Sequence, residues 1–362
     1  MLLFLILMMI PLYIPTIFIP YWTRKTESFG VSIPEEAYQR TDLKKMRKNY
    51  AWITSILAVI TTAILLLTAG GQDENFIGIL YSILISAYVI VTFFVYLIFH
   101  GKMKKLKSQY PEWTKKQQVI TVSTHFRREK LTYSNFWFVI PFLISIATIA
   151  FTLLNYQQIP DRFPTQYNFS GEITTWTNKS YRSVLLMPIM QIYLTLLFLF
   201  INIVISKAKQ QVSAANPEES LKQNITFRRR WSLFTILMGT GLIIVFMLPQ
   251  FSLIYPISHQ LLMYVPLAYA LIACGGSIIL SITTGQGGSR VRSTAGINGQ
   301  VIDRDDDRYW KLGMFYFNPK DPAIFLEKRF GIGWTNNWAH PLSWIFIIVV
   351  ILLAFGLPKL LG

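Results

Sequence analysis

The sequence predicts an all-α fold: a polytopic transmembrane helix bundle of about eight helices, with the N-terminus outside and a small cytoplasmic insert before the last helix. Two observations predict it. The 362 residues are 52% hydrophobic and only 14% charged, whereas a soluble domain carries roughly 25% charged residues. In addition, long apolar runs are separated by loops that are alternately rich and poor in basic residues.

Eight segments of the chain are long and apolar enough to cross a bilayer, which takes about 20 residues. None of them contains Lys, Arg, Asp or Glu. The first segment lacks the basic start and the small-residue cleavage site of a signal peptide, and Arg24 and Lys25 follow it, so we expect it to be a membrane helix. In chain order the segments are 2–22, 51–69, 76–99, 136–154, 184–206, 231–249, 259–282 and 341–358.

The distribution of basic residues predicts the orientation. The loops 23–50, 100–135, 207–230 and 283–340 hold 30 of the 34 Lys and Arg residues. Basic loops face the cytoplasm, so eight crossings place both termini outside, in a multi-pass protein of the cell membrane. This topology, with attraction to anionic lipid, accounts for the net charge of +16. The lipid bilayer is therefore the expected partner, and no nucleic-acid partner is expected.

We expect four regions along the chain. Residues 1–135 form three helices with two basic cytoplasmic loops, and residues 136–206 form a helix, an outer loop and a second helix. Residues 207–282 contain helices six and seven with the basic loop before them. Residues 283–362 form an acidic and aromatic cytoplasmic module and the last helix. The small clusters Gly239–Gly241 and Ala273–Ser277 are expected to be helix-packing faces.

The motifs of common enzyme classes are missing from the sequence. It has no His-Glu-x-x-His, no Gly-x-Ser-x-Gly and no Walker loop, and its four histidines are isolated. We therefore predict no catalytic residues, no metal site and no cofactor. The glycine-rich run 285–290 lacks the Gly-Lys-Ser/Thr ending of a phosphate loop and is interpreted as a flexible linker. The spans lack the charges that proton-coupled transporters keep at membrane depth; their most polar residues are Gln191, Asn202, His259 and Gln260.

The cytoplasmic module holds one set of candidate residues. The acidic cluster Asp303, Asp305, Asp306 and Asp307 is interpreted as a solvated turn, with a weak divalent-cation site as the alternative. The aromatic stretch 309–322 ends in a Pro-bounded turn and predicts a short hairpin. The basic and aromatic stretch 328–338 is expected to be an interfacial anchor for the last helix. The candidate site residues are Asp306, Asp307, Arg308, Tyr309, Trp310, Arg329 and His340.

The outer loop 155–182 holds the other set. Pro160 and Pro164 predict an extended lead-in, and the run from Asn168 to Gly171 predicts a tight turn in which Gly171 takes positive φ. Trp176 is expected at the level of the lipid headgroups, with Asp161, Glu172, Lys179 and Arg182 forming a small outward-facing charged set. The binding candidates are Pro160, Asp161, Pro164, Tyr167, Asn168, Gly171, Trp176 and Lys179.

This loop, with Ile140-Pro141 before it and Pro188 after it, resembles a domain of unknown function found in Gram-positive membrane proteins. Its best-known relatives are the immunity proteins of the sporulation-delaying-protein toxin system. Those proteins protect the producer from its own secreted toxin and sequester a transcriptional repressor at the membrane. The matching positions are Pro160, Phe163, Pro164, Tyr167, Asn168, Gly171, Trp176 and Lys179, with Tyr167 in place of a commoner tryptophan.

The tail of the chain resembles a second uncharacterised module that often accompanies the first and that the immunity proteins lack. The matching residues are Asp306 to Trp310, Pro319, Lys328, Arg329, Gly331 to Gly333, Asn337, His340 and Pro341. Three hypotheses follow. The first is immunity to, or sensing of, a toxic membrane-active peptide outside, with signalling to a cytoplasmic regulator. The alternatives are a transporter or flippase-like permease, and a membrane-embedded enzyme that acts on lipid or peptide.

Overall fold

The chain folds into two compact units, each built from several segments of the sequence. The computed structural model describes residues 2–115, 117–119, 129–168, 171–209, 211–213, 216–291, 301–303 and 306–361. Unit 1 comprises Met1–Leu131, Ala208–Arg228 and Ile278–Pro341. Unit 2 comprises Thr132–Lys207, Arg229–Ser277 and Leu342–Gly362.

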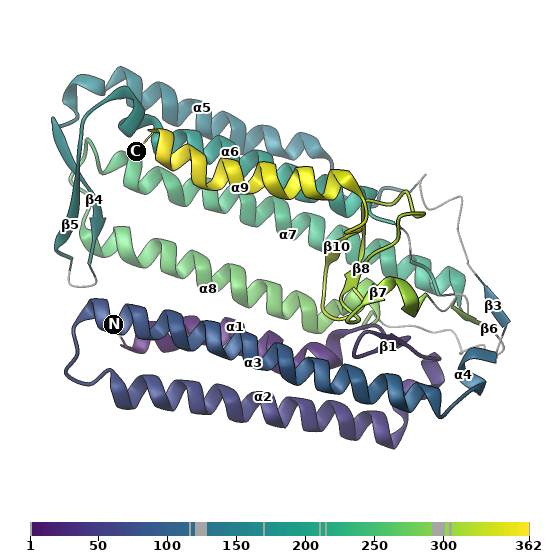
Figure 1. Ribbon diagram of the computed structural model, residues 1–362. Helices are drawn as coiled ribbons and strands as arrows, with labels where there is room; N and C mark the ends of the chain where they lie inside the picture. Colours follow the sequence, from purple (N-terminus) through teal and green to yellow (C-terminus); the bar gives the residue numbers. More distant parts are fainter. Residues whose placement is uncertain are drawn as a thin grey trace. The chain divides into compact units, whose positions relative to one another are not determined.

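Within the described residues, eight helices are long and apolar enough to cross a membrane, which confirms the predicted number (Figure 1). A ninth helix, α4 (Glu112–Lys115), has four residues. The eight long helices are α1 (Leu2–Trp22), α2 (Thr41–Thr68), α3 (Glu74–Ser108), α5 (Val139–Leu154), α6 (Tyr181–Lys207), α7 (Pro217–Phe251), α8 (His259–Thr284) and α9 (Pro341–Leu361).

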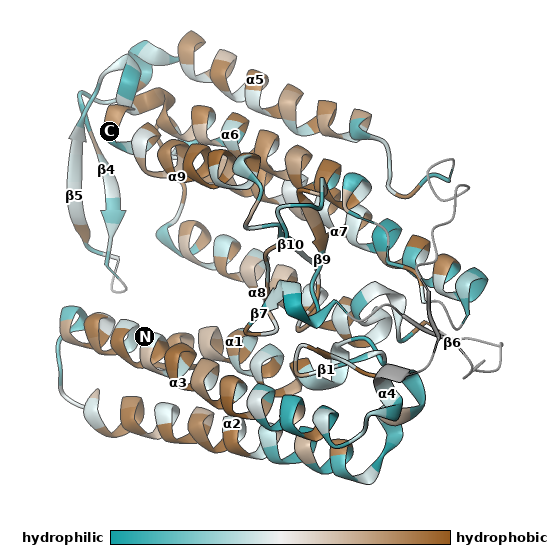
Figure 2. Ribbon diagram, turned by 45° about the vertical axis from the view of Figure 1, so that its right-hand side comes forward, coloured by the Kyte–Doolittle hydropathy of each residue, from teal (hydrophilic) through white to brown (hydrophobic). Residues whose placement is uncertain are grey.

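Three helices extend well beyond the apolar segments that predict them. α2 begins at Thr41, α3 continues to Ser108 and α7 begins at Pro217. The added turns are rich in Lys, Arg and Glu, which favour helix and whose charge needs water rather than lipid. Figure 2 shows these ends of α2, α3 and α7 as hydrophilic. At its other end α3 starts at a conventional cap, because the Asp73 carboxylate accepts a hydrogen bond of 2.6 Å from the Phe76 amide.

Unit 1 contains the three-helix group α1, α2 and α3, which packs through two apolar clusters. Leu5, Met9, Leu65 and Ile77 fill one cluster between the helices. The larger cluster lies where the basic ends of α2 and α3 meet the loop after α1, and its members include Phe29, Tyr50, Phe99 and Phe330. Because Phe330 belongs to the segment before α9, this cluster joins the N-terminal helices to a segment near the C-terminus.

Unit 2 contains α5, α6, α9 and most of α7 and α8, and its helices approach closely at glycines. A Cβ added to Gly239 would lie 2.8 Å from the Phe198 ring, and one added to Gly276 would lie 2.9 Å from Phe234. Both small clusters are therefore packing faces, as predicted. The interior also holds polar side chains: Gln250 donates to the Thr152 hydroxyl at 2.8 Å and to the Val184 carbonyl at 3.0 Å.

The described strands are short and form two-stranded sheets. Antiparallel hairpins join β1 to β2, β4 to β5, β7 to β8 and β9 to β10, and β3 pairs with β6 in parallel. Their bounds are β1 (Glu27–Ser28), β2 (Val31–Ser32), β3 (Gln117–Val119), β4 (Arg162–Tyr167), β5 (Ile173–Asn178), β6 (Val301–Asp303), β7 (Trp310–Lys311), β8 (Phe315–Tyr316), β9 (Phe325–Glu327) and β10 (Trp334–Asn336). The hairpin β7–β8 confirms the one predicted in 309–322.

Candidate functional sites

The loop between α5 and α6 in unit 2 is a β-hairpin, β4–β5, which we call the outer hairpin. The described residues of its turn have the predicted geometry, whereas Phe169 and Ser170 lie outside the described part of the chain. The Asn168 amide donates to the Glu172 carbonyl at 2.9 Å, the Glu172 amide donates to Asn168 Oδ1 at 2.8 Å, and Gly171 has φ +87°. A side chain at Gly171 would also collide with His259, since its Cβ would lie 2.9 Å from the imidazole Cδ2. The sequence predicted this turn but not the strands beside it.

The base of the outer hairpin is fastened to the helix bundle. Phe163 is buried in a cluster with Ile159 and Val184. The Lys179 ammonium donates to the Ile159 carbonyl at 2.6 Å and lies 4.7 Å from the centre of the Tyr156 ring. The Lys179 amide donates to the Asp161 carbonyl at 2.8 Å, next to the exposed Pro160. These contacts hold the strands in a defined position.

The other face of the outer hairpin is open. Pro164 pairs with Trp176, and the Trp176 side chain is 50% exposed. Tyr167 pairs with Ile173, and these side chains are 38% and 39% exposed. The Tyr167 ring lies 5.1 Å from the His259 ring at the start of α8, and burial there raises the pKa of the Tyr167 hydroxyl.

Of the expected charged set, Asp161, Glu172 and Arg182 are exposed, but the two acidic residues stand at opposite ends of the hairpin. Glu172 lies at the turn, where its carboxylate accepts from Asn168 Nδ2 at 2.8 Å. Asp161 lies beside Lys179 at the opposite end of the strands. Because a strand rises about 3.3 Å per residue, the length of β4 separates the two carboxylates. Among its exposed polar residues, the outer hairpin also presents three large aromatic and apolar side chains, Tyr167, Ile173 and Trp176.

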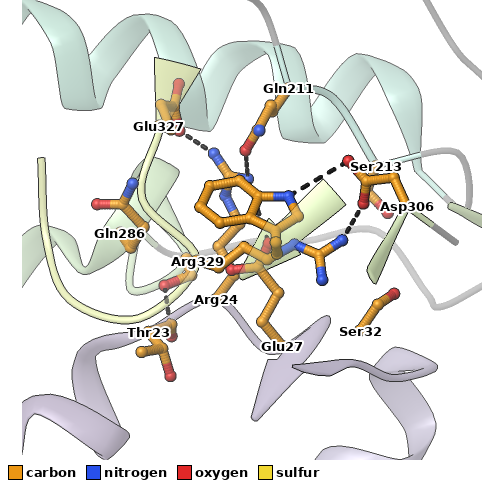
Figure 3. A network of polar contacts seen from close by, with 12 residues as sticks. Thr23, Arg24, Glu27, Ser32, Gln211, Ser213, Gln286, Asp306, Glu327 and Arg329 are labelled. Atoms are coloured by element: carbon orange, nitrogen blue, oxygen red, sulfur yellow. Dashed lines mark hydrogen bonds and ion pairs between the residues drawn. The ribbon is translucent and has the colours of Figure 1, made fainter. Parts of the chain in front are cut away.

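The second candidate site is a buried ion-pair network in unit 1 (Figure 3). The carboxylate of Glu327 and the guanidinium of Arg228 are fully buried and lie 3.1 Å apart. Arg24 pairs with the second carboxylate oxygen of Glu327 and also bonds to Gln211. Asn224 bridges the pair, since its Nδ2 donates to Glu327 at 2.7 Å and its Oδ1 accepts from Arg228 at 2.8 Å. The network thus ties α7 and the segment after α1 to β9.

Two of the predicted acidic residues lie in a second group of ion pairs beside this network. The Arg329 guanidinium is buried and pairs with both Asp306 and Asp307. Lys107 of α3 lies 2.8 Å from Asp307, and the Ser32 amide donates to Asp307 at 3.1 Å. The carboxylates are therefore neutralised by cations of the protein, so the interpretation as a solvated turn is wrong for Asp306 and Asp307. Asp305 and the Asp303 side chain lie outside the described residues.

The other candidate residues of the cytoplasmic module do not lie together in one site. Trp310 is buried under Arg329, with the guanidinium carbon 5.1 Å from the ring centre. Arg308 and Tyr309 contact one another, and Arg308 is exposed. The His340 amide donates to the Asn337 carbonyl at 2.9 Å, just before α9. In the part of the chain that the structure describes, no group of three or more His, Cys, Asp or Glu residues is placed to hold a metal.

Two interpretations of local sequence are overturned by the packing of unit 1. The glycine-rich run 285–290 is not a linker: Gln286 is fully buried and bonds to both the amide and the carbonyl of Gly333, at 2.7 and 2.9 Å. A Cβ at Gly287 would lie 2.6 Å from Arg24 Nε, so glycine is needed there for close approach. The stretch 328–338 is not a simple interfacial anchor, because Arg329 and Phe330 are buried.

Sequence reasoning missed most of the buried network. Arg24 and Arg228 belong to the pattern of basic residues that predicts topology, and Asn224 and Gln286 have no motif around them. Glu327 did carry a weak signal, since it is the single acidic residue between Pro322 and His340. Near it, Asp321 receives the Lys209 ammonium at 2.5 Å and the Tyr316 hydroxyl at 2.8 Å. Burial alone would raise the pKa of Asp321, but these bonds and one from the Ala323 amide hold it below its ordinary value.

Comparison with known protein families finds two domains of unknown function, one that contains the outer hairpin and one that contains part of the buried network. Residues 143–192 match the "Domain of unknown function (DUF1648)", which spans most of α5, the outer hairpin and the start of α6. Residues 319–344 match the "Family of unknown function (DUF5808)", which supplies Glu327 and Arg329. The chain is a multi-pass membrane protein that carries both domains. No curated protein and no solved structure matches it.

Proposed function

We propose that this protein senses, or gives immunity to, a membrane-active peptide outside the cell and signals to a regulator in the cytoplasm. The observation that carries the proposal is the outer hairpin. It combines a base fastened by Phe163 and Lys179 with an exposed surface of Tyr167, Ile173 and Trp176. Aromatic side chains on a rigidly held loop are a common means of binding peptides, because they lose little entropy on binding.

The cytoplasmic half of the proposal rests on the buried network of unit 1. Arg24 follows α1, Lys107 lies in the last turn of α3 and Arg228 lies just before the apolar part of α7, and each is paired with a carboxylate of the segment 306–327. A folded module that is ion-paired to helix ends is suited to respond when those helices move. The basic loops around it would dock an acidic regulator, because complementary charge steers association. The orientation of the protein in the cell membrane belongs to the same proposal.

The test is protection of a sensitive bacterial host by the full-length chain. Cells that express it are expected to survive secreted membrane-active peptides better than cells with an empty vector, and to change transcription when the peptide is added. Trp176→Ala is expected to abolish protection, whereas Trp137→Ala is the matched control, because Trp137 is 51% exposed but lies at the start of α5. Unchanged survival with wild type across a panel of such peptides, or equal protection by both variants, would contradict the proposal.

The permease alternative receives no support from the interior of unit 2. It calls for polar side chains that face a path between helices. Instead, Asn202 Nδ2 donates to Asn135 at 2.8 Å, and Asn202 Oδ1 accepts from Ser232 at 2.6 Å. Gln250 is likewise bonded across helices. Interhelical hydrogen bonds of this kind hold a membrane bundle together.

A further inference from the structure

The hairpin β7–β8 of unit 1 exposes apolar side chains that the proposed function does not use. Leu312, Phe315 and Phe317 are 48%, 38% and 47% exposed. In the same two strands, the side chains of Trp310 and Tyr316 are buried. We call the three exposed residues the apolar tip. Adjacent exposed apolar side chains on an otherwise polar module usually mark a contact surface.

The turn that carries Leu312 of the apolar tip lies beside the apolar part of α3. The Tyr96 hydroxyl donates to the Leu312 carbonyl at 2.8 Å. Gly313 lies against the same helix, since a Cβ there would be 2.6 Å from the Tyr96 hydroxyl and 2.7 Å from the His100 ring. The first lysine of α3, Lys102, follows Tyr96 by six residues, or about 9 Å of helix. The turn of β7–β8 therefore lies on the membrane side of the α3 lysines.

The backbone of this turn is suited to surroundings with little water, because several of its polar groups are bonded within the protein. The Gly313 amide donates to the Trp310 carbonyl at 3.3 Å, and the Met314 amide donates to the Lys311 carbonyl at 3.2 Å. The Phe317 amide donates to the Tyr309 carbonyl at 2.8 Å. Irregular backbone is tolerated at membrane depth only when such bonds are made. Leu312 itself has φ +52°, a conformation that leucine rarely adopts, and the bond to Tyr96 holds it.

The basic residues beside the apolar tip are suited to contact with an anionic lipid surface. Arg308 and Lys311 are both exposed and flank the tip on its amino-terminal side. Long basic side chains at this level can reach phosphate groups while their stems stay in apolar surroundings. Anionic lipids attract such residues at the membrane surface. A soluble partner would explain the exposed rings but not their depth along α3.

We propose that the apolar tip inserts into the boundary between headgroups and acyl chains of the leaflet next to the basic loops. β7–β8 is then a monotopic membrane contact of the module, in addition to the eight helices. The occupant of the surface is lipid, with Arg308 and Lys311 at the level of the phosphates. This inference does not depend on the proposed peptide-sensing function.

The test uses fluorescence of the full-length protein in vesicles of phosphatidylcholine and phosphatidylglycerol. The single cysteine, Cys274, is replaced by serine, and Leu312→Cys carries an environment-sensitive nitrobenzoxadiazole label. Insertion of roughly 5–10 Å predicts blue-shifted emission and strong quenching by lipids brominated near the carbonyl end of their acyl chains. Lys320→Cys, on an exposed turn of the same module, is the aqueous control, and Val59→Cys on α2 is the membrane control.

Two results would overturn the inference. Red-shifted emission without quenching, like that of the Lys320→Cys label, would place the apolar tip in water. Blue-shifted emission without bromine quenching would mean that protein rather than lipid covers it. Phe317→Cys, whose native side chain is 47% exposed, provides a second labelled position if Leu312→Cys does not fold. Blue-shifted emission with bromine quenching at both labelled positions, unlike the Lys320→Cys control, is the expected result.

Discussion

At the scale of single residues, the defining feature is charge buried in unit 1 and paired there. Glu327 accepts from Arg24, Arg228 and Asn224, so each of its carboxylate oxygens is satisfied. Placing a carboxylate in such surroundings carries a desolvation penalty that only its partners offset. Removing one member of the network is therefore expected to lower the free energy of unfolding by more than the loss of a surface ion pair would.

We predict that Glu327→Gln destabilises the protein by about 3–5 kcal/mol, because Arg24 and Arg228 are left near a neutral amide. The measurement is the midpoint of thermal unfolding in detergent. Glu218→Gln is the control, because Glu218 is exposed on the first turn of α7 and its loss should change stability by less than about 1 kcal/mol. Equal midpoints for the two variants would show that the network contributes little to the fold.

At the scale of elements, the outer hairpin shows how a loop can be exposed and still ordered. An isolated two-stranded hairpin is marginally stable in water. Here Phe163 on β4 packs against Ile159 and Val184, and the Lys179 ammonium closes the base. The exposed side chains of Tyr167, Ile173 and Trp176 depend on these anchors for their position, although they are not part of the buried cluster.

We predict that Phe163→Ala releases the outer hairpin, because the buried ring is worth about 3–5 kcal/mol of packing. Protease added to the outside of intact cells is expected to cleave the variant between β4 and β5 much faster than it cleaves wild type. Trp176→Ala removes an exposed ring from the same hairpin and should leave the cleavage rate near that of wild type. If both variants were cleaved at the wild-type rate, Phe163 would not be the anchor.

At the scale of the whole molecule, the eight helices and the alternating basic loops together predict one topology. The spans are free of Lys, Arg, Asp and Glu, and the loops with many basic residues follow odd-numbered spans. The bias of basic residues toward the cytoplasm then places both termini outside. On this predicted topology we expect the outer hairpin outside the cell and the network of unit 1 on the cytoplasmic side.

Reporter fusions test this topology. Alkaline phosphatase, which is active only outside, should be active when fused after Gly71 or Pro256 and inactive after Tyr110 or Gln211. A green fluorescent protein, which fluoresces when it folds inside, should give the complementary pattern. The reverse assignment at all four junctions would invert the orientation, and it would put the outer hairpin in the cytoplasm.

The eight spans and the turn from Asn168 to Gly171 followed from the sequence alone. Both depend on local physics, namely the length of an apolar run and the freedom of glycine at positive φ. The burial of Glu327, the need for glycine at position 287 and the depth of Leu312 were decided only by the tertiary structure. Arg24 and Glu327 are 303 residues apart, and Tyr96 and Leu312 are 216 apart. Contacts between residues so far apart produce no periodic pattern in a single sequence. Neither partner has a motif around it, and the contact forms only because the fold brings the two residues together.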